Sequence, residues 1–232
     1  VILTLYQHIR YNSYYIGVFM CFCNQLWVEN QDIIQKIVSM DFLQAMFDGS
    51  LSDETFYYYI EQDIHYLNDY AKANAYLMTK SENLEQLKFF LDSVNASFEE
   101  QERVHAHYTT QPAYSQKNTL TPAFKNYSVF ILYHTASKSL PIGYASIMAC
   151  PWLYVYLGEY FSAKKFNNNK YQYWFEANCT AEVQEWLFKQ KKYLETFANN
   201  NPSYHKEMKK LFREALFLEY EFWNDAYLLK SI

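Results

Sequence analysis

The stretch ASIMACPWLYVYLGEYF, residues 145–161, is almost entirely apolar or aromatic, and its length and composition predict a buried helix. Pro151 belongs in the first turn of a helix or kinks one, because it lacks a backbone N–H. Cys150 precedes it, and a thiol near a helix start meets unpaired N–H groups that favour the thiolate. A lone cysteine in an apolar run is also an ordinary core residue. The stretch alone leaves both interpretations open.

The composition of the whole chain indicates long helices in one domain. Of 232 residues, 50% are hydrophobic and 20% aromatic, which is ample for a core. Only 4 Gly and 5 Pro are present, too few for the frequent turns of an all-β chain. No linker, repeat or low-complexity tract divides the sequence. We therefore predict an all-α fold of about seven helices in a single domain.

Charge and cysteine usage narrow the classes of partner. The net charge is −5, and no basic cluster is long enough to follow a phosphate backbone, so no nucleic-acid partner is expected. The 4 cysteines stand at 21, 23, 150 and 179, without zinc spacing or a disulfide framework. A reducing cytoplasm is the simplest setting.

The first 25 residues stand apart from the helical pattern. Their apolar run from Tyr14 to Cys23 is too short to span a bilayer, so no membrane contact is expected. The run has the length of a signal-peptide core, but no small-x-small cleavage site follows it. We assign residues 1–25 to an extension of unknown role and residues 26–232 to the helical domain.

Helices are expected where apolar residues recur every three or four positions between turn signals. Gly49 predicts a turn, Ser52 an N-cap, and Asn83 with Gln86 a capping box. The sixth helix should be interrupted near residues 178–180. The expected helices cover about residues 26–46, 52–80, 83–108, 123–137, 140–166, 171–197 and 204–229.

Two acidic residues share helix faces with aromatic rings. Asp63 lies three residues before Tyr66, and Glu219 three before Phe222, which is the spacing of neighbours on one helix face. A carboxylate in such surroundings needs partners, or its pKa rises. The alternative for each is an exposed acid on an amphipathic helix, paired with a lysine in the case of Asp63.

One further motif keeps a different chemistry open. Glu102-x-x-His105 has the spacing of half a di-iron site in a helical bundle. A second half is missing, since the other close pair, Glu61 and His65, is separated by four positions. We expect no metal, but the half-motif retains a di-iron or cofactor-free oxidase as an alternative.

Five blocks, in this order and spacing, resemble the TenA, or thiaminase II, family. They are MDFLQAMFDGSLSDETFYYYIEQDIHYLNDYAKA (40–73), PAFKNY (122–127), IMACPWLYVYLGE (147–159), YQYWF (171–175) and LEYEFWNDAY (218–227). The likeness runs from about Leu26 to Leu229. It implies an all-helical, haem-oxygenase-like bundle, usually assembled as a homotetramer. Cys150 stands where one branch of the family has its cysteine.

The resemblance also implies an activity. The family binds an aminopyrimidine and hydrolyses thiamin or aminomethyl-aminopyrimidine to hydroxymethylpyrimidine in thiamin salvage, without metal or cofactor. Carried over by motif, Cys150 would add to the ring, Glu219 would contact one ring nitrogen and move protons, and Asp63 would bind the exocyclic amine and the other nitrogen. Four more residues would contact the substrate: Tyr66, Tyr127 and Tyr154 through hydrogen bonds, and Phe222 by packing on the ring.

Asn178 departs from the family pattern, which usually has a Tyr seven residues after the position of Tyr171. As a substrate contact, Asn178 can donate and accept hydrogen bonds, but it lacks the volume and the phenol of a tyrosine. The departure bears on substrate choice and rate more than on the fold. It also keeps open a non-catalytic, pyrimidine-binding regulatory protein.

Overall fold

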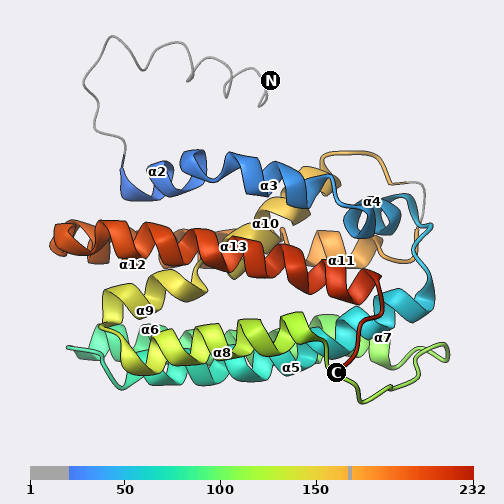
Figure 1. Cartoon of the computed structure of the whole chain (residues 1–232), viewed down its shortest axis with the longest axis horizontal. Coiled ribbons are helices and arrows are strands. Elements are labelled where there is room, and N and C mark those ends of the chain that lie inside the picture. Colours follow the sequence, from blue (N-terminus) through green and yellow to red (C-terminus); the bar gives the residue numbers. More distant parts are fainter. Residues whose placement is uncertain (1–20, 167–168) are drawn as a thin grey trace, which may run out of the picture.

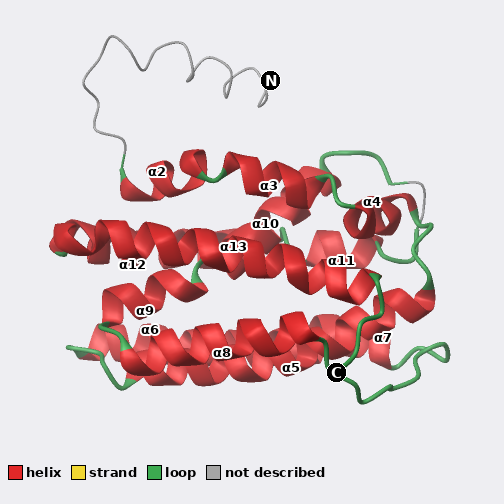
Figure 2. Cartoon of the chain, in the orientation of Figure 1, coloured by secondary structure: helices red, strands yellow, loops and turns green. Residues whose placement is uncertain are grey.

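The computed structural model describes residues 21–166 and 169–232, and every regular element in these ranges is helical (Figure 2). The expected all-α fold is confirmed. The α-helices are α2 (Phe22–Glu29), α3 (Gln31–Val38), α4 (Asp41–Asp48), α5 (Asp53–Met78), α6 (Leu84–Glu100), α7 (Ala106–Thr109), α8 (Pro122–Ser137), α9 (Leu140–Ile147), α10 (Ala149–Ser162), α11 (Gln172–Ala177), α12 (Ala181–Asn200) and α13 (His205–Tyr227). A π-helical turn, η1 (Gln101–His105), joins α6 to α7, and a 3-10 turn, η2 (Pro202–Tyr204), precedes α13.

Several of the expected helices are divided by local breaks. The segment around Cys150 forms α9 and α10 because Pro151 offers no N–H to the carbonyl of Ile147. Cys150 therefore lies in the first turn of α10. The first expected segment forms α2, α3 and α4, and Asn30 ends α2 by donating from its side chain to the carbonyl of Leu26 at 2.8 Å. The expected interruption near residues 178–180 is present between α11 and α12.

The predicted helix ends are confirmed by their hydrogen bonds. Gly49 ends α4 in the left-handed region, with φ 82°. The Ser52 side chain accepts from the N–H of Thr55 at 3.1 Å at the start of α5. The Asn83 side chain likewise accepts from the N–H of Gln86 at 2.9 Å before α6. The Gln86 side chain accepts from the N–H of Glu82 rather than from that of Asn83, so the predicted capping box forms only in part.

Helix α13 lies at the centre of the molecule. In Figure 1 it runs lengthwise through the middle, with α5 and α8 on one side and α2 and α3 on the other. It contacts α3, α4, α5, α8, α9 and α10. An acidic residue on the inner face of such a helix is therefore enclosed from several directions, which matters for Glu219.

The stretch quoted first forms the core of this arrangement. By length and composition Leu140–Ser162 could cross a membrane, but 89% of its most apolar window is buried inside the fold. Leu153, Leu157 and Phe161 are 0% exposed. Each such side chain contributes about 2 kcal/mol of burial free energy, so this stretch is the core around which the other helices pack.

The helical body begins before residue 26. Phe22 and Cys23 are buried, and their backbone N–H groups donate to the two carboxylate oxygens of Glu195 at 3.0 and 2.9 Å. These bonds tie the start of α2 to α12. Residues 1–20, which hold most of the assigned extension and the apolar run from Tyr14, lie outside the described residues, as do residues 167–168 of the expected break after α10.

Candidate active site

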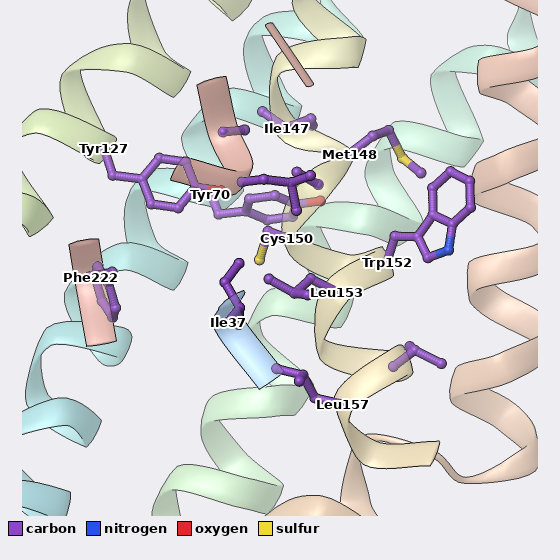
Figure 3. Packing of buried hydrophobic residues seen from close by; sticks show 14 of the residues in the cluster. Ile37, Tyr70, Tyr127, Ile147, Met148, Cys150, Trp152, Leu153, Leu157 and Phe222 are labelled. Atoms are coloured by element: carbon purple, nitrogen blue, oxygen red, sulfur yellow. The ribbon is translucent and has the colours of Figure 1, made fainter. Parts of the chain in front are cut away.

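Cys150 is buried at the start of α10, with 8% of its surface exposed. Its sulfur points to the side on which Tyr127 and Phe222 lie, whereas Trp152 leaves the helix on the opposite side (Figure 3). Burial raises the pKa of the thiol well above its usual value, and the nearby carboxyl groups of Glu219 and Asp63 raise it further. The expectation that the helix start favours the thiolate is therefore wrong for the protein without substrate, because the effect of burial on the thiol outweighs that of the helix dipole.

Glu219 lies on the inner face of α13 and is 1% exposed. Its Oε1 accepts a hydrogen bond from the Tyr127 hydroxyl at 2.8 Å. Burial raises the pKa of Glu219 to about 8; Asp63 raises it too, and hydrogen bonds from Tyr127 and Cys150 oppose the shift. Glu219 is thus mostly a neutral acid at pH 7. The exposed-acid alternative fits its neighbour Glu221 instead.

Asp63, on α5, is 4% exposed and has partners on both oxygens. Its Oδ2 lies 2.8 Å from Nε2 of His105. Its Oδ1 accepts a longer hydrogen bond, at 3.4 Å, from the hydroxyl of Tyr154. The Tyr154 hydroxyl lies 3.2 Å from that of Tyr59, one turn before Asp63 on α5. The alternative of an exposed Asp63 paired with a lysine is excluded.

Three aromatic residues pack behind the thiol. The ring centroid of Tyr66 lies 4.7 Å from that of Tyr127 and 5.8 Å from that of Phe222. The Tyr66 hydroxyl is buried beside the Cys150 sulfur, to which it can donate a hydrogen bond. Burial and the proximity of Cys150 raise the pKa of Tyr66 well above its usual value, so its hydroxyl keeps its proton beside the sulfur.

A cavity of about 450 Å³ reaches this cluster. Its buried end includes Asp63, Tyr70, Cys150 and Asn178, which are buried, and Tyr154, which is half-buried. Its exposed end is formed by α6, η1 and the start of α12, with Glu99, Glu100, Arg103, Glu182 and Trp186 in the wall. The other four predicted site residues, Glu219, Tyr66, Tyr127 and Phe222, do not line the cavity but are buried around Cys150.

Asn178 is held in the cavity wall by the end of α11. Its side chain donates to the carbonyl of Trp174 at 2.9 Å, and it is 7% exposed. Helix α10 approaches closely here, since a Cβ at Gly158 would lie 2.8 Å from the carbonyl oxygen of Phe175. Asn178 itself takes part in this close approach, since the same Cβ would lie 3.1 Å from the Cβ of Asn178, so the residue both lines the cavity and packs against α10.

The predicted half-motif for iron is not assembled. Glu102 is exposed, whereas His105 is 2% exposed and contacts Asp63 on α5. The π-helical turn η1 contains both residues, and its register differs from that of an α-helix. In residues 21–166 and 169–232 no three His, Cys, Asp or Glu side chains gather into a group that could hold a metal ion.

Comparison with known proteins identifies the family of this chain and relatives with the same fold. The model of the TENA/THI-4/PQQC family matches residues 27–229. The thiamine biosynthesis multifunctional protein ThiED of Corynebacterium efficiens is 25% identical over 152 residues, 65% of this chain, which spans only about a fifth (21%) of that protein. The aminopyrimidine aminohydrolase of Helicobacter pylori is 25% identical over 210 residues, covering 87% of this chain and 96% of its own. A TenA homologue from Pyrococcus furiosus has the same fold, with a TM-score of 0.82 at 20% identity over 88% of this chain and 99% of its own.

Proposed function

The chain belongs to the TENA/THI-4/PQQC family, and from this premise we propose that it is an aminopyrimidine aminohydrolase of the thiaminase II type. The proposed reaction replaces the leaving group on the methylene carbon of an aminopyrimidine by water, yielding hydroxymethylpyrimidine for thiamin salvage. The substrate is thiamin or aminomethyl-aminopyrimidine. The observation that carries the proposal is the meeting of the Cys150 thiol with the carboxyl groups of Glu219 and Asp63, from α10, α13 and α5.

Asp63 is proposed to bind the amidine edge of the substrate. An exocyclic amine donates to a carboxylate, and the adjacent ring nitrogen, which is an acceptor when neutral, donates to it only when protonated. Asp63 Oδ1 has only the long contact with Tyr154, so it is the oxygen that a ligand would engage first. In the proposal, Tyr154 and Asn178 complete the wall beside the ring.

Glu219 is proposed to supply the first proton. Because its pKa is raised to about 8, it carries a proton at neutral pH and can give it to the second ring nitrogen. A protonated ring is electron-poor and accepts a nucleophile. Direct contact with the ring requires the pocket to open beyond Cys150 on binding, since Glu219 does not line the cavity.

Cys150 is proposed to add to the ring once that proton has moved. The ionised Glu219 takes the thiol proton, a bond forms between sulfur and a ring carbon, and Tyr66 donates to the sulfur. Electrons of the adduct then expel the leaving group from the methylene carbon, as a neutral thiazole from thiamin or as ammonia from a protonated aminomethyl group. Water adds to that carbon and loses a proton to the solvent. The carbon–sulfur bond then breaks, and the proton on the ring nitrogen returns through Glu219 to the sulfur, which restores the thiol. The chain supplies every group in these steps, so we propose no metal or cofactor.

Product analysis tests the proposal. The purified protein is incubated separately with thiamin and with aminomethyl-aminopyrimidine, and release of hydroxymethylpyrimidine is followed. We expect release from at least one substrate. Tight binding of either compound without turnover would favour the regulatory alternative, and turnover that consumes oxygen would favour the oxidase.

The assembly and the compartment are further parts of the proposal. We propose a homotetramer in the cytoplasm, with no nucleic-acid or membrane partner. Support for assembly comes from α6, where Leu84, Leu87, Leu91 and Phe98 are 64%, 43%, 48% and 46% exposed. Support for the compartment comes from the cysteines, all of which are unpaired. Light scattering after size exclusion measures the assembly.

A further inference from the structure

We propose that His105 is a positioning residue for the reaction: its Nε2–H holds the Asp63 carboxylate in the orientation that receives the substrate. This inference rests on the proposed function for what Asp63 binds. The contact itself is independent of the proposed function, because it joins two side chains of this chain at 2.8 Å.

The contact is enclosed on every side. The His105 side chain is 2% exposed and that of Asp63 is 6% exposed. A hydrogen bond to an ionised group in such surroundings is stronger than one between neutral groups, and losing it leaves a buried charge without compensation. With Oδ2 fixed by His105, the carboxylate cannot rotate without breaking this bond, so Oδ1 stays directed to the cavity.

The tautomer of His105 follows from its partners. An ionised carboxylate only accepts hydrogen bonds, so Nε2 must carry the hydrogen. Nδ1 is buried and finds no partner in the described part of the chain. The geometry therefore assigns a hydrogen to Nε2, which donates to Asp63.

The backbone brings His105 to this place through the π-helical turn. Val104 and His105 are adjacent in sequence and both buried, at 0% and 2% exposure, as the wide turn of η1 allows. The other charged groups near the ring are Glu100, from the end of α6, and Arg103, which lies 3.7 Å from Glu100. Glu100 lies on the cavity wall, and within residues 21–166 and 169–232 Asp63 is the one carboxylate that His105 bonds.

A positioning role predicts a specific kinetic signature. Asp63 is proposed to bind the amidine edge both in the substrate complex and in the transition state. If Asp63 loses its orientation, binding in both of these states is weakened alike. The His105→Leu variant should therefore raise KM roughly 10- to 100-fold while kcat changes much less. His105→Gln places an amide N–H at about the reach of Nε2. We therefore expect its KM to lie much closer to that of the wild type than to that of His105→Leu.

The experiment compares these two variants with His107→Gln, a matched control. His107 lies two residues along the same helical segment, is exposed, and packs on Tyr173 rather than Asp63. Thermal unfolding is recorded for every variant, and kinetics are compared among the folded ones. A KM within twofold of wild type in His105→Leu would overturn the proposal. An equal rise of KM in the Leu and Gln variants, at equal stability, would also overturn the proposal and leave His105 only a packing role.

A ligand-free measurement keeps the contact testable even if the Leu variant does not fold. Nitrogen-15 NMR of the histidine rings in the wild-type protein should include a ring with a hydrogen on Nε2 whose signal is absent from His105→Gln. If the signal lost in His105→Gln is that of a ring protonated on Nδ1 alone, the assignment is overturned. Failure of the proposed function is seen separately, as a wild-type protein that releases no hydroxymethylpyrimidine although this signal is present.

Discussion

The two ends of the cavity differ in almost every physical respect. At the buried end Cys150 stands among Asp63, Glu219 and tyrosines, and burial keeps protons on Cys150 and Glu219. At the exposed end, the walls from α6, η1 and α12 carry several charged side chains in contact with water, among them Glu99 and Glu182. The first environment suits proton movement without water, and the second suits a charged group that arrives and departs.

This difference teaches where each kind of selectivity resides. In a low-dielectric site a single proton or hydrogen bond changes the rate by orders of magnitude, whereas charges in water are screened. Substitutions at the buried end should therefore act mainly on the chemical step and by large factors. Substitutions at the exposed end should act on binding and by small factors.

The largest expected effect is at Cys150. Replacing it with Ser leaves a weaker nucleophile with a still higher pKa, so kcat should fall roughly 10³-fold or more with either substrate. Cys179→Ser is the control, because Cys179 is half-buried beside Ser162 and outside the cavity. Product release measured for both variants decides this. A Cys150→Ser enzyme as fast as wild type would show that Cys150 is not the nucleophile, and it would contradict the contrast between the two ends of the cavity.

The next effect is at Glu219. It is protonated below its pKa of about 8 and ionised above, so wild-type kcat/KM should decline as pH rises through about 8. Glu219→Gln can neither give nor take the proton, and kcat should fall roughly 10²- to 10³-fold, with this alkaline decline lost. Glu221→Gln, on the exposed side of the same helix, should leave the profile unchanged. An alkaline decline that survives in Glu219→Gln must come from another group.

Much of the fold and of the buried end could be predicted from the sequence, because local rules govern them. Ser52 and Gly49 set helix ends through their own side chain or backbone. Asp63 and Glu219 shared helix faces with aromatic rings, and burial followed because those faces are the inner ones. A one-dimensional pattern carries this information since it needs only the helical period.

What the sequence could not supply depends on contacts between distant segments. The sequence relates His105 to Glu102, three residues away, only as half of an alternative metal site. Its partner in the structure is Asp63, 42 positions earlier, because η1 changes the register of the helix. The thiolate expectation for Cys150 failed for the same reason. The helix start is visible in the sequence, whereas the burial that outweighs it arises only when α5 and α13 close around the sulfur.

A moderate effect is expected at Asn178, which lies at the buried end and lines the cavity. In Asn178→Tyr the larger ring extends into the cavity, so the KM for thiamin should rise roughly 5-fold, while aminomethyl-aminopyrimidine, with its smaller leaving group, should be little affected. Asn178→Ala removes the bond to the carbonyl of Trp174 without adding volume and separates the two causes. Parallel shifts of KM for both substrates would show that Asn178 does not select by size.

The smallest effect is expected at the exposed end. Glu99→Gln removes one negative charge from a wall that a cationic thiazolium would pass, so KM for thiamin should rise about 2-fold at low ionic strength, and the difference should vanish at about 0.5 M salt. Glu102→Gln is the matched control, since Glu102 is exposed three residues further on but does not line the cavity. A large, salt-insensitive loss in Glu99→Gln would mean that this carboxylate acts at short range on the substrate, and the exposed end would then share in the chemistry that the contrast reserves for the buried one.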